Sequence, residues 1–273
     1  MTSQSRRSNC REKTARLCRL LRDFGRVGIA FSGGADSSFL LRSALDALGA
    51  ENVLALHGRS CLQKKEEQER VAAWPERHGF PAVWLRLVEL EPLQWQEFVR
   101  NPPDRCYFCK RHICQLFQAL LAEEGIAVLL DGSNADDLQQ GETSRPGLRA
   151  IAELGVRSPL ADCGFSKAEI RDLSRELGLE TWNQPASSCL ATRIPQGMEI
   201  TVARLEQVAA MEQVLAEAGF SGCRARLLDE AAVCLQLQQN DMEQFWPGEI
   251  RKPLCSQLKK QGAEKILLDL DGR

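Results

Sequence analysis

The stretch that decides the fold reads VGIAFSGGADSS, from Val27 to Ser38. Its first five residues are apolar and have the length of a buried strand, and residues 39–48 carry apolar side chains at helical spacing. Between them, Gly33 and Gly34 can adopt positive φ angles and let backbone N–H groups surround an anion. The N-terminal dipole of the following helix is directed at the same place. The stretch therefore predicts a strand, a glycine turn and a helix that together hold phosphate.

Side chains of this turn add to the predicted phosphate site, because hydroxyl donors stand at Ser32, Ser37 and Ser38. The stretch lacks the Gly-Lys-Ser/Thr ending of a Walker A loop. Ser-Gly-Gly-x-Asp-Ser instead resembles the PP-loop of the ATP pyrophosphatase superfamily. That resemblance implies cleavage of ATP between the α- and β-phosphates, with pyrophosphate held by residues 32–37 and Mg²⁺ held partly by Asp36. The alternative is an ordinary strand-to-helix turn that happens to contain glycines.

Composition and charge narrow the class of protein. The 273 residues are 44% hydrophobic and 26% charged, as in a globular protein with a sizeable core. A net charge of −2 gives no global basic field for nucleic acid. No apolar run approaches the roughly 20 residues of a membrane span, and residues 1–13 are polar and basic rather than signal-like. We therefore expect a cytoplasmic protein without nucleic-acid or membrane partners.

The eleven cysteines do not resemble a secreted disulfide framework, because their number is odd and they are scattered. We expect small core side chains at Cys18, Cys61, Cys114, Cys223, Cys234 and Cys255. Cys106, Cys109 and Cys189 are the ones whose contexts suggest chemistry. Cys106 and Cys109 lie about one turn apart near the predicted start of a helix capped by Asp104, where the helix dipole favours a thiolate.

Strands and helices alternate over the first two thirds of the chain. The expected strands are residues 27–31, 52–57, 82–88 and 126–130, and the expected helices are residues 9–24, 39–48, 64–79 and a segment that follows Asp104. This alternation predicts an α/β fold with a doubly wound parallel sheet. Ligands bind beyond the carboxyl ends of such strands. The turn at residues 32–38, Arg59-Ser60 and the stretch after the third strand should therefore line one crevice, with His57 as a polar residue at a strand end. The polar turn 131–137 also follows a strand, at the position where ligand groups belong.

The later part of the chain predicts a second, smaller α/β domain. Residues 143–156 and 181–195 have the composition of loops, and Ser166 to Glu169 have the form of a helix capping box. From residue 201 we expect helices at 201–218, 241–246 and 252–261, and strands at 223–228, 233–237 and 266–270. We expect a first domain at residues 1–198 and a second at residues 199–273.

Six motifs together resemble the LarE family of ATP-dependent sulfur transferases, which make the nickel-pincer nucleotide cofactor of lactate racemase and related enzymes. In order, the motifs are Ser-Gly-Gly-Ala-Asp-Ser (32–37), Asn-Pro-Pro-Asp-Arg-Cys-Tyr-Phe-Cys-Lys (101–110), Asp-Gly-Ser-Asn-Ala-Asp-Asp (131–137), Arg-Pro-Gly (145–147), Gly-Val-Arg-Ser-Pro-Leu (155–160) and Ser-Cys-Leu-Ala-Thr-Arg-Ile-Pro (188–195). The match extends from about Gly28 to beyond Thr201, and it is looser after that.

The resemblance implies a reaction on a pyridinium dicarboxylate mononucleotide. A carboxylate of this substrate is adenylated, pyrophosphate leaves into the turn at residues 32–37, and a sulfur nucleophile then displaces AMP to give a thiocarboxylate. This sequence is chemically reasonable, because a carboxylate is a poor electrophile until adenylation gives it a good leaving group. Sulfur is an effective nucleophile at neutral pH.

Members of the family differ in the source of the sulfur. Some sacrifice the sulfur of one cysteine, whereas others bind a [4Fe-4S] cluster on three cysteines and use it to present an added sulfide. This chain has cysteines at all three matching positions, Cys106, Cys109 and Cys189, and three thiolates leave one iron of a cluster open. Two alternatives remain: a zinc site completed by Cys114 or Cys163, or Cys189 as a sacrificial donor with Cys106 and Cys109 merely buried.

In the smaller domain, Arg224 and Arg226 alternate along a strand and match an arginine pair that the family uses to hold the substrate phosphate. The alternative is a pair of exposed strand residues. The chain departs from the family at Leu227-Leu228, where His-His is common, and it ends at Arg273, before the usual tail. Because family members can assemble as hexamers, the resemblance implies a homo-oligomer.

Other classes of function fit the sequence less well. Some tRNA thiolases combine a PP-loop with a three-cysteine cluster, but the net charge and the lack of a basic stripe or an RNA-binding domain do not favour RNA. A ligase related to GMP or NAD synthetase would need an ammonia source, and no glutaminase segment is evident. A non-enzymatic iron–sulfur or nucleotide-binding regulator would fit a decayed site, but the turn residues look intact.

Overall fold

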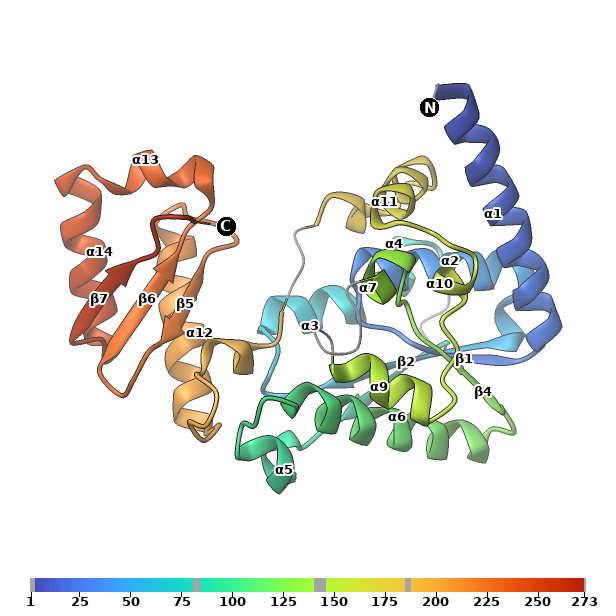
Figure 1. The fold of residues 1–273 in the computed structure, drawn as a ribbon, viewed down its shortest axis with the longest axis horizontal. Coiled ribbons are helices and arrows are strands. Elements are labelled where there is room, and N and C mark those ends of the chain that lie inside the picture. Colours follow the sequence, from blue (N-terminus) through green and yellow to red (C-terminus); the bar gives the residue numbers. More distant parts are fainter. Residues whose placement is uncertain (1–2, 81–83, 140–145, 185–187, 273) are drawn as a thin grey trace. The chain divides into compact units, whose positions relative to one another are not determined.

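The computed structural model describes residues 3–80, 84–139, 146–184 and 188–272, and the chain forms two compact units (Figure 1). The first unit contains residues 1–60, 65–90 and 104–186. The second contains residues 61–64, 91–103 and 187–273. The second unit therefore includes two short segments from the first half of the sequence. The expected domain boundary between residues 198 and 199 stays a prediction.

The first unit is built on a four-stranded parallel sheet with the order β3-β2-β1-β4. Its strands are β1 (Val27–Ala30), β2 (Val53–Arg59), β3 (Leu85–Glu89) and β4 (Val128–Leu130). Val27 of the central strand pairs with Val53 on one side and with Val128 on the other. The predicted parallel α/β sheet is confirmed.

Helices cover both faces of this sheet (Figure 1). They are α1 (Ser3–Phe24), α2 (Ala35–Leu48), α3 (Lys65–Ala72), α4 (Trp74–Arg77), α6 (Arg105–Glu123), α7 (Ala135–Gln139), α9 (Pro146–Glu153), α10 (Pro159–Asp162) and α11 (Lys167–Glu176), with short 3-10 turns η1 (Ala50–Asn52) and η4 (Glu180–Asn183). Val27 and Ile29 point into the apolar cluster that contains α1, α2 and α11. Gly28 faces the other way, and a Cβ there would lie 2.2 Å from Cδ1 of Leu121 on α6. Alternate residues of β1 thus contact opposite helix layers, which confirms the doubly wound arrangement.

Two local expectations in the first unit were wrong. The described part of the expected loop 143–156 contains helix α9, which begins with Pro146 at its first position. This helix is attached to α6, because the Tyr107 hydroxyl donates to Glu153 at 2.6 Å and the Arg149 guanidinium lies 4.0 Å from the centre of the Tyr107 ring. The expected helix 64–79 is divided at Ala73 into α3 and α4, since Pro75 has no N–H to continue the first helix.

Strand and cap details mostly follow the prediction. The third strand begins at Leu85, and residues 81–83 of the expected strand lie outside the described residues. Ser166 forms the predicted capping box, in which its hydroxyl accepts from Glu169 N and the Glu169 carboxylate accepts from Ser166 N. Asp104 precedes α6, but its side chain makes no capping hydrogen bond, so that expectation was wrong.

The second unit is a small α/β layer, as predicted. A three-stranded sheet of order β5-β6-β7 pairs β5 with β6 antiparallel and β6 with β7 parallel. Its elements are η3 (Pro92–Gln94), α5 (Gln96–Val99), η5 (Leu190–Arg193), α12 (Val202–Glu217), β5 (Arg224–Leu227), β6 (Ala232–Gln236), η6 (Gln239–Asp241), α13 (Met242–Phe245), α14 (Gly248–Lys260) and β7 (Lys265–Leu268). Apolar side chains of α12, α14 and the sheet form its core. Within the described part of the chain, no helix is both long enough and apolar enough to cross a bilayer.

Candidate active site

The predicted phosphate-binding turn, residues 32–37, is called the phosphate turn below. It lies between β1 and α2, where the sequence predicts it. Gly33 has a φ of +76°, a backbone conformation that side chains with a Cβ rarely adopt. The Ser37 hydroxyl lies 3.0 Å from the Ser32 hydroxyl, accepts from Ser32 N at 3.3 Å and donates to Gly34 O at 3.2 Å. Ser37 therefore braces the turn internally, whereas Ser32 and Gly34 are exposed.

The turn after β4 packs directly on this phosphate turn. A Cβ on Gly132 would lie 2.9 Å from Ser37 N and 3.1 Å from Ser37 Cα, so a side chain at this position would displace the start of α2. The crossovers from β1 and β4 diverge at this edge, which is the switch point where open parallel sheets bind ligands. The turn at residues 131–137 is thus brought beside the phosphate turn.

Asp36 carries an oxygen that is suited to a metal ion. Its Oδ1 atom is buried and accepts no hydrogen bond from the described residues. Burial raises the pKa of this carboxyl, and nearby Lys167 offsets that effect only in part. A buried carboxylate oxygen beside a phosphate site fits Mg²⁺, which prefers oxygen ligands and commonly shares them with phosphates.

Asp131 is a buried anion at the end of β4 and has a full set of donors. It accepts from Ser133 N at 3.2 Å, from the Ser133 hydroxyl at 2.9 Å and from the Ser158 hydroxyl at 2.7 Å. Lys110 Nζ lies 3.5 Å from Asp131 Oδ2. Burial lowers the pKa of Lys110, but the nearby Asp131 carboxylate outweighs it and the pKa is raised. Lys110 therefore stays a cation at one edge of the site.

Cys106 and Cys109 occupy the first two turns of α6, three residues apart and so on neighbouring positions of the helix surface. Cys106 is exposed and Cys109 is partly buried. The predicted proximity of the two thiols to one helix start is confirmed. Lys110 follows Cys109 directly, so α6 presents two thiols and an ammonium group within one and a half turns.

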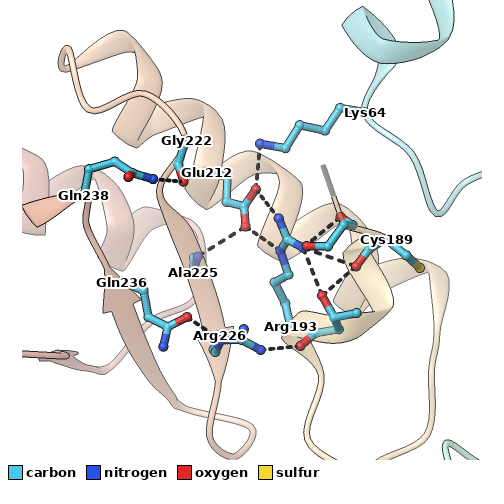
Figure 2. Close-up of polar contacts among 11 residues, drawn as sticks. Lys64, Cys189, Arg193, Glu212, Gly222, Ala225, Arg226, Gln236 and Gln238 are labelled. Carbon is cyan, nitrogen blue, oxygen red and sulfur yellow. Dashed lines mark hydrogen bonds and ion pairs between the residues drawn. The ribbon is translucent and has the colours of Figure 1, made fainter. Parts of the chain in front are cut away.

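The second unit holds the backbone at Cys189 in a buried network (Figure 2). The Cys189 carbonyl accepts from Thr192 N at 2.9 Å, from the Thr192 hydroxyl at 2.8 Å and from Arg193 Nη1 at 3.2 Å. Arg193 Nη1 also donates to the Ser188 carbonyl and hydroxyl. Figure 2 shows the Cys189 sulfur pointing away from this network. The backbone is thus fixed while the thiol is directed elsewhere.

Glu212 of α12 is the centre of this network. Its carboxylate accepts from Arg193 Nε at 2.6 Å and from Arg193 Nη2 at 3.1 Å, and it also accepts from Ala225 N on β5 at 3.3 Å (Figure 2). Lys64 Nζ lies 2.6 Å from the same carboxylate. Burial raises the pKa of Glu212, but hydrogen bonds and charges from Arg193 and Lys64 outweigh it, so the pKa is lowered.

Arg224 and Arg226 project from β5 on the same side and are both partly buried rather than exposed. Arg226 Nε donates to Gln236 Oε1 and Arg226 Nη1 donates to the Thr192 carbonyl, each at 2.6 Å (Figure 2). The arginine strand and the segment that carries Cys189 are therefore joined directly. Two carboxylates face these cations: Glu212 pairs with Arg193 and Lys64, and Asp269 accepts from the Gln236 amide that Arg226 contacts.

Sequence reasoning missed two residues that organise the site. Asn101 has a φ of +54°, is fully buried, and donates through Nδ2 to the carbonyls of Ile194, Pro195 and Met198. An asparagine before two prolines is a signal for such a turn. Glu212 could have been found as the one acidic residue on the apolar face of α12, next to Met211.

The three predicted cluster cysteines are divided between the units, because Cys106 and Cys109 belong to the first and Cys189 to the second. In the portion of the chain that the structure describes, no three His, Cys, Asp or Glu side chains are grouped so that they could hold a metal ion. The assignment of these cysteines to one site stays a prediction. Arg145 lies outside the described residues.

Comparison with known proteins adds the decisive observation. Pyridinium-3,5-bisthiocarboxylic acid mononucleotide synthase from Lactiplantibacillus plantarum is 34% identical over 260 residues, which cover 95% of this chain and 91% of that protein. The chain belongs to the LarE family. As a LarE-family member it is an ATP-dependent sulfur transferase of the PP-loop type. No protein-family model matches the chain.

Two further relatives show how far the likeness extends. An uncharacterized Synechocystis protein is 34% identical over 250 residues, covering 92% of this chain and 90% of the relative. A glutamine-hydrolyzing GMP synthase from Thermoplasma volcanium is 31% identical over 206 residues, or 70% of this chain and 63% of the relative. The first likeness extends over nearly the whole chain, and the second supports the wider PP-loop superfamily.

Proposed function

We propose that this LarE-family protein converts a carboxylate of pyridinium-3,5-biscarboxylic acid mononucleotide to a thiocarboxylate, for the synthesis of the nickel-pincer nucleotide cofactor. The observation that carries the proposal is the near full-length likeness to the Lactiplantibacillus plantarum synthase, together with an intact phosphate turn. The substrate is an anionic nucleotide, and both units present cationic side chains.

The first step activates the carboxylate. A carboxylate oxygen of the substrate attacks the α-phosphorus of ATP, a P–O bond forms, and the bond to the β-phosphate breaks. The leaving pyrophosphate is received by the turn at residues 32–37 and by the N-terminus of α2. Mg²⁺ would be held partly by Asp36, whose buried Oδ1 has no hydrogen bond among the described residues, and would neutralise the phosphate charge.

The second step replaces AMP by sulfur. A sulfur nucleophile adds to the acyl carbon, the C–O bond to AMP breaks, and the thiocarboxylate remains. We propose that Cys106, Cys109 and Cys189 would hold a [4Fe-4S] cluster, which supplies an iron able to carry added sulfide. The network of Arg193 and Glu212 fixes the backbone of Cys189 for either use of that thiol, as cluster ligand or as sulfur donor.

Arg224 and Arg226 are proposed to hold the substrate phosphate. Arginine forks suit phosphate, and both guanidinium groups project from the same side of β5, which supports an anionic ligand there. Leu227 is buried in the core and Leu228 is 49% exposed, so this pair, which replaces a common His-His, offers no polar group to the substrate. A cytoplasmic location, a homo-oligomer and the absence of a nucleic-acid partner belong to the same proposal.

The experiment combines product mass with metal content. Protein purified without oxygen is incubated with ATP, Mg²⁺, sulfide and the dicarboxylate nucleotide. The mass of the nucleotide is then measured by mass spectrometry. We expect a product heavier by the difference between sulfur and oxygen, together with AMP and pyrophosphate. An unchanged nucleotide in the presence of bound ATP would overturn the function.

The metal content and the protein mass of the same samples identify the source of the sulfur. We expect about four irons and as many acid-labile sulfides per chain, and loss of both in Cys189→Ala but not in Cys255→Ala, whose cysteine lies on α14. Zinc in place of iron would assign the cysteines a structural role. A Cys189 that becomes lighter by hydrogen sulfide during turnover, with no metal bound, would assign it as the sacrificial donor.

A further inference from the structure

A small hollow opens beside Gly33 in the first unit, between α3, α4 and the turn η4. Its lining includes Gly33 of the phosphate turn, Arg70 and Val71 of α3, Trp74 and Arg77 of α4, and Thr181 of η4. The hollow is fixed to the phosphate turn, because Val71 packs so closely on Gly33 that a Cβ on Gly33 would lie 2.3 Å from Val71 Cγ2.

Three residues that line this hollow each carry a buried polar atom with no hydrogen-bond partner among the described residues. These atoms are Arg70 Nε, Trp74 Nε1 and Thr181 Oγ1. The side chains of Trp74 and Thr181 belong to residues that are only 4% and 3% exposed. Leaving such groups unpaired is costly, and buried polar atoms in native proteins are nearly always satisfied by protein, water or ligand. Each of the three can donate a hydrogen, so together they call for an acceptor.

The charge of the hollow specifies an anion. Arg77 is neutralised by Glu180, whose carboxylate lies 2.8 Å from Arg77 Nη1. The His78 ring is engaged through Nδ1 with the Trp74 carbonyl at 2.9 Å. Arg70 has no ion pair within the residues that the structure describes, so the hollow carries one uncompensated positive charge. A guanidinium fork with neighbouring N–H and O–H donors is a site for a phosphate group.

We propose that this hollow receives the terminal phosphate of ATP, and that Arg70, Trp74 and Thr181 bind the β- and γ-phosphates as they leave as pyrophosphate. The inference rests on the proposed use of ATP. The phosphate turn supplies backbone donors on one side, and Arg70 supplies a side-chain cation on the other, a role that a lysine fills in Walker A loops. Arg70 is thus a substrate-binding residue outside the motif that sequence reasoning identified.

The test measures the binding of inorganic pyrophosphate to the full chain by calorimetry. We expect Arg70→Gln to raise the Kd of pyrophosphate about tenfold or more, and Thr181→Val and Trp74→Phe to raise it several-fold. The double variant Arg77→Gln, Glu180→Gln is the matched control, because it removes the ion pair from the same hollow without changing its net charge, and its Kd should change less than about twofold. AMP, which lacks the terminal phosphates, should bind all four variants like the unaltered protein.

Several outcomes would overturn the inference: an unchanged pyrophosphate Kd in Arg70→Gln, an equal loss in the double variant Arg77→Gln, Glu180→Gln, or an equal loss of AMP binding. Thr181→Val differs from the native side chain by one hydroxyl, so it keeps the test open even if a variant of Arg70 folds poorly. Failure of the proposed function looks different. If the protein forms no thiocarboxylate but binds pyrophosphate through Arg70, only the proposed function is rejected. If the enzyme is active and Arg70→Gln binds pyrophosphate normally, only the present inference is rejected.

Discussion

Glu212 and His57 are both buried polar residues, but their surroundings have opposite effects on them. Glu212 lies among donors that stabilise its charged form, with Arg193 and Lys64 in direct contact. His57 lies near the carboxyl end of β2, and its Nδ1 atom is 2.7 Å from the Phe31 carbonyl oxygen. Because a carbonyl oxygen can only accept, Nδ1 carries the hydrogen. Its Nε2 atom is buried without a partner in the described part of the chain. Folding therefore selects the charged form of Glu212 and the neutral form of His57.

Removal of the Glu212 charge should weaken the second unit. In Glu212→Gln the Arg193 guanidinium stays buried beside an uncharged group, and we expect the free energy of unfolding to fall by about 3 kcal/mol. The measurement is denaturant unfolding of the full chain. Glu217→Gln is the control, because Glu217 is exposed on the same helix and its loss should cost less than about 0.5 kcal/mol. Equal stability of the two variants would show that the buried network contributes nothing.

The protonation of His57 should make stability depend on pH. Burial lowers the pKa of this imidazole in the folded protein, so the unfolded chain binds the proton more readily. The stability contributed by the neutral ring is complete above the unfolded pKa of about 6.5. It is lost as pH falls below that value toward the folded pKa, with a slope of at most about 1.4 kcal/mol per pH unit. Chemical unfolding at several pH values between 5 and 8 measures this slope. The His57→Asn variant should have a shallower slope, and an unchanged slope would assign the effect to other groups.

The sequence could predict the residues of the phosphate turn, because the φ of +76° found at Gly33 strongly favours glycine. It marks Glu212 only as an acidic residue on the apolar face of α12, and it could not predict Arg70 or the partners of either side chain. Those roles depend on which side chains remain unpaired or become buried after packing, and that information comes from distant segments. The sequence indicates which side chains are polar or reactive, and the tertiary structure decides which of them lack a hydrogen-bond or ion-pair partner.

At the scale of elements, the phosphate turn is held by two neighbours and by one of its own side chains. Val71 of α3 packs on Gly33, the turn at Gly132 packs on Ser37, and the Ser37 hydroxyl closes the turn internally. The turn is therefore a fixed part of the strand-turn-helix unit before any ligand binds. Preorganised donors of this kind cost no rearrangement when charge develops on the phosphates.

A matched pair of glycine substitutions tests this rigidity. Gly33→Ala places a Cβ in the left-handed region and against Val71, so we expect the free energy of unfolding to fall by about 2 kcal/mol or more. Gly34→Ala should change it by less than about 1 kcal/mol, because Gly34 has a φ of −81° and the nearest atom to its new Cβ would be Ser32 Oγ at 3.5 Å. Thermal and denaturant unfolding measure both. Equal losses would mean that the turn is not held by α3.

Elements were predictable where hydrophobic periodicity was strong. The parallel strands and the helix-strand alternation follow from apolar runs such as residues 27–31 and 53–56. Helix α9 was missed because Pro146 and Gly147 suggest a turn, whereas the helix is stabilised by its packing on α6. Tertiary contacts override local propensity in such a short helix.

At the scale of the whole molecule, the two units divide the proposed work. The first unit carries the phosphate turn, Asp36 and the Arg70 hollow, which act on ATP. The second carries Cys189 and the strand arginines, which we propose act on the sulfur and on the substrate phosphate. The fold class and the family could be recognised from the sequence. The extension of the second unit to residues 61–64 and 91–103 could not, because no local pattern marks a segment that packs far along the chain.

The central claim is that one oxygen of the substrate carboxylate leaves with AMP. The direct measurement uses substrate whose carboxylate oxygens are oxygen-18, followed by mass spectrometry of the AMP formed. If the carboxylate attacks the α-phosphorus and sulfur then breaks the C–O bond, AMP must carry one labelled oxygen for each thiocarboxylate made. AMP without the label, formed alongside the thiocarboxylate, would contradict adenylation of the carboxylate and with it the proposed function.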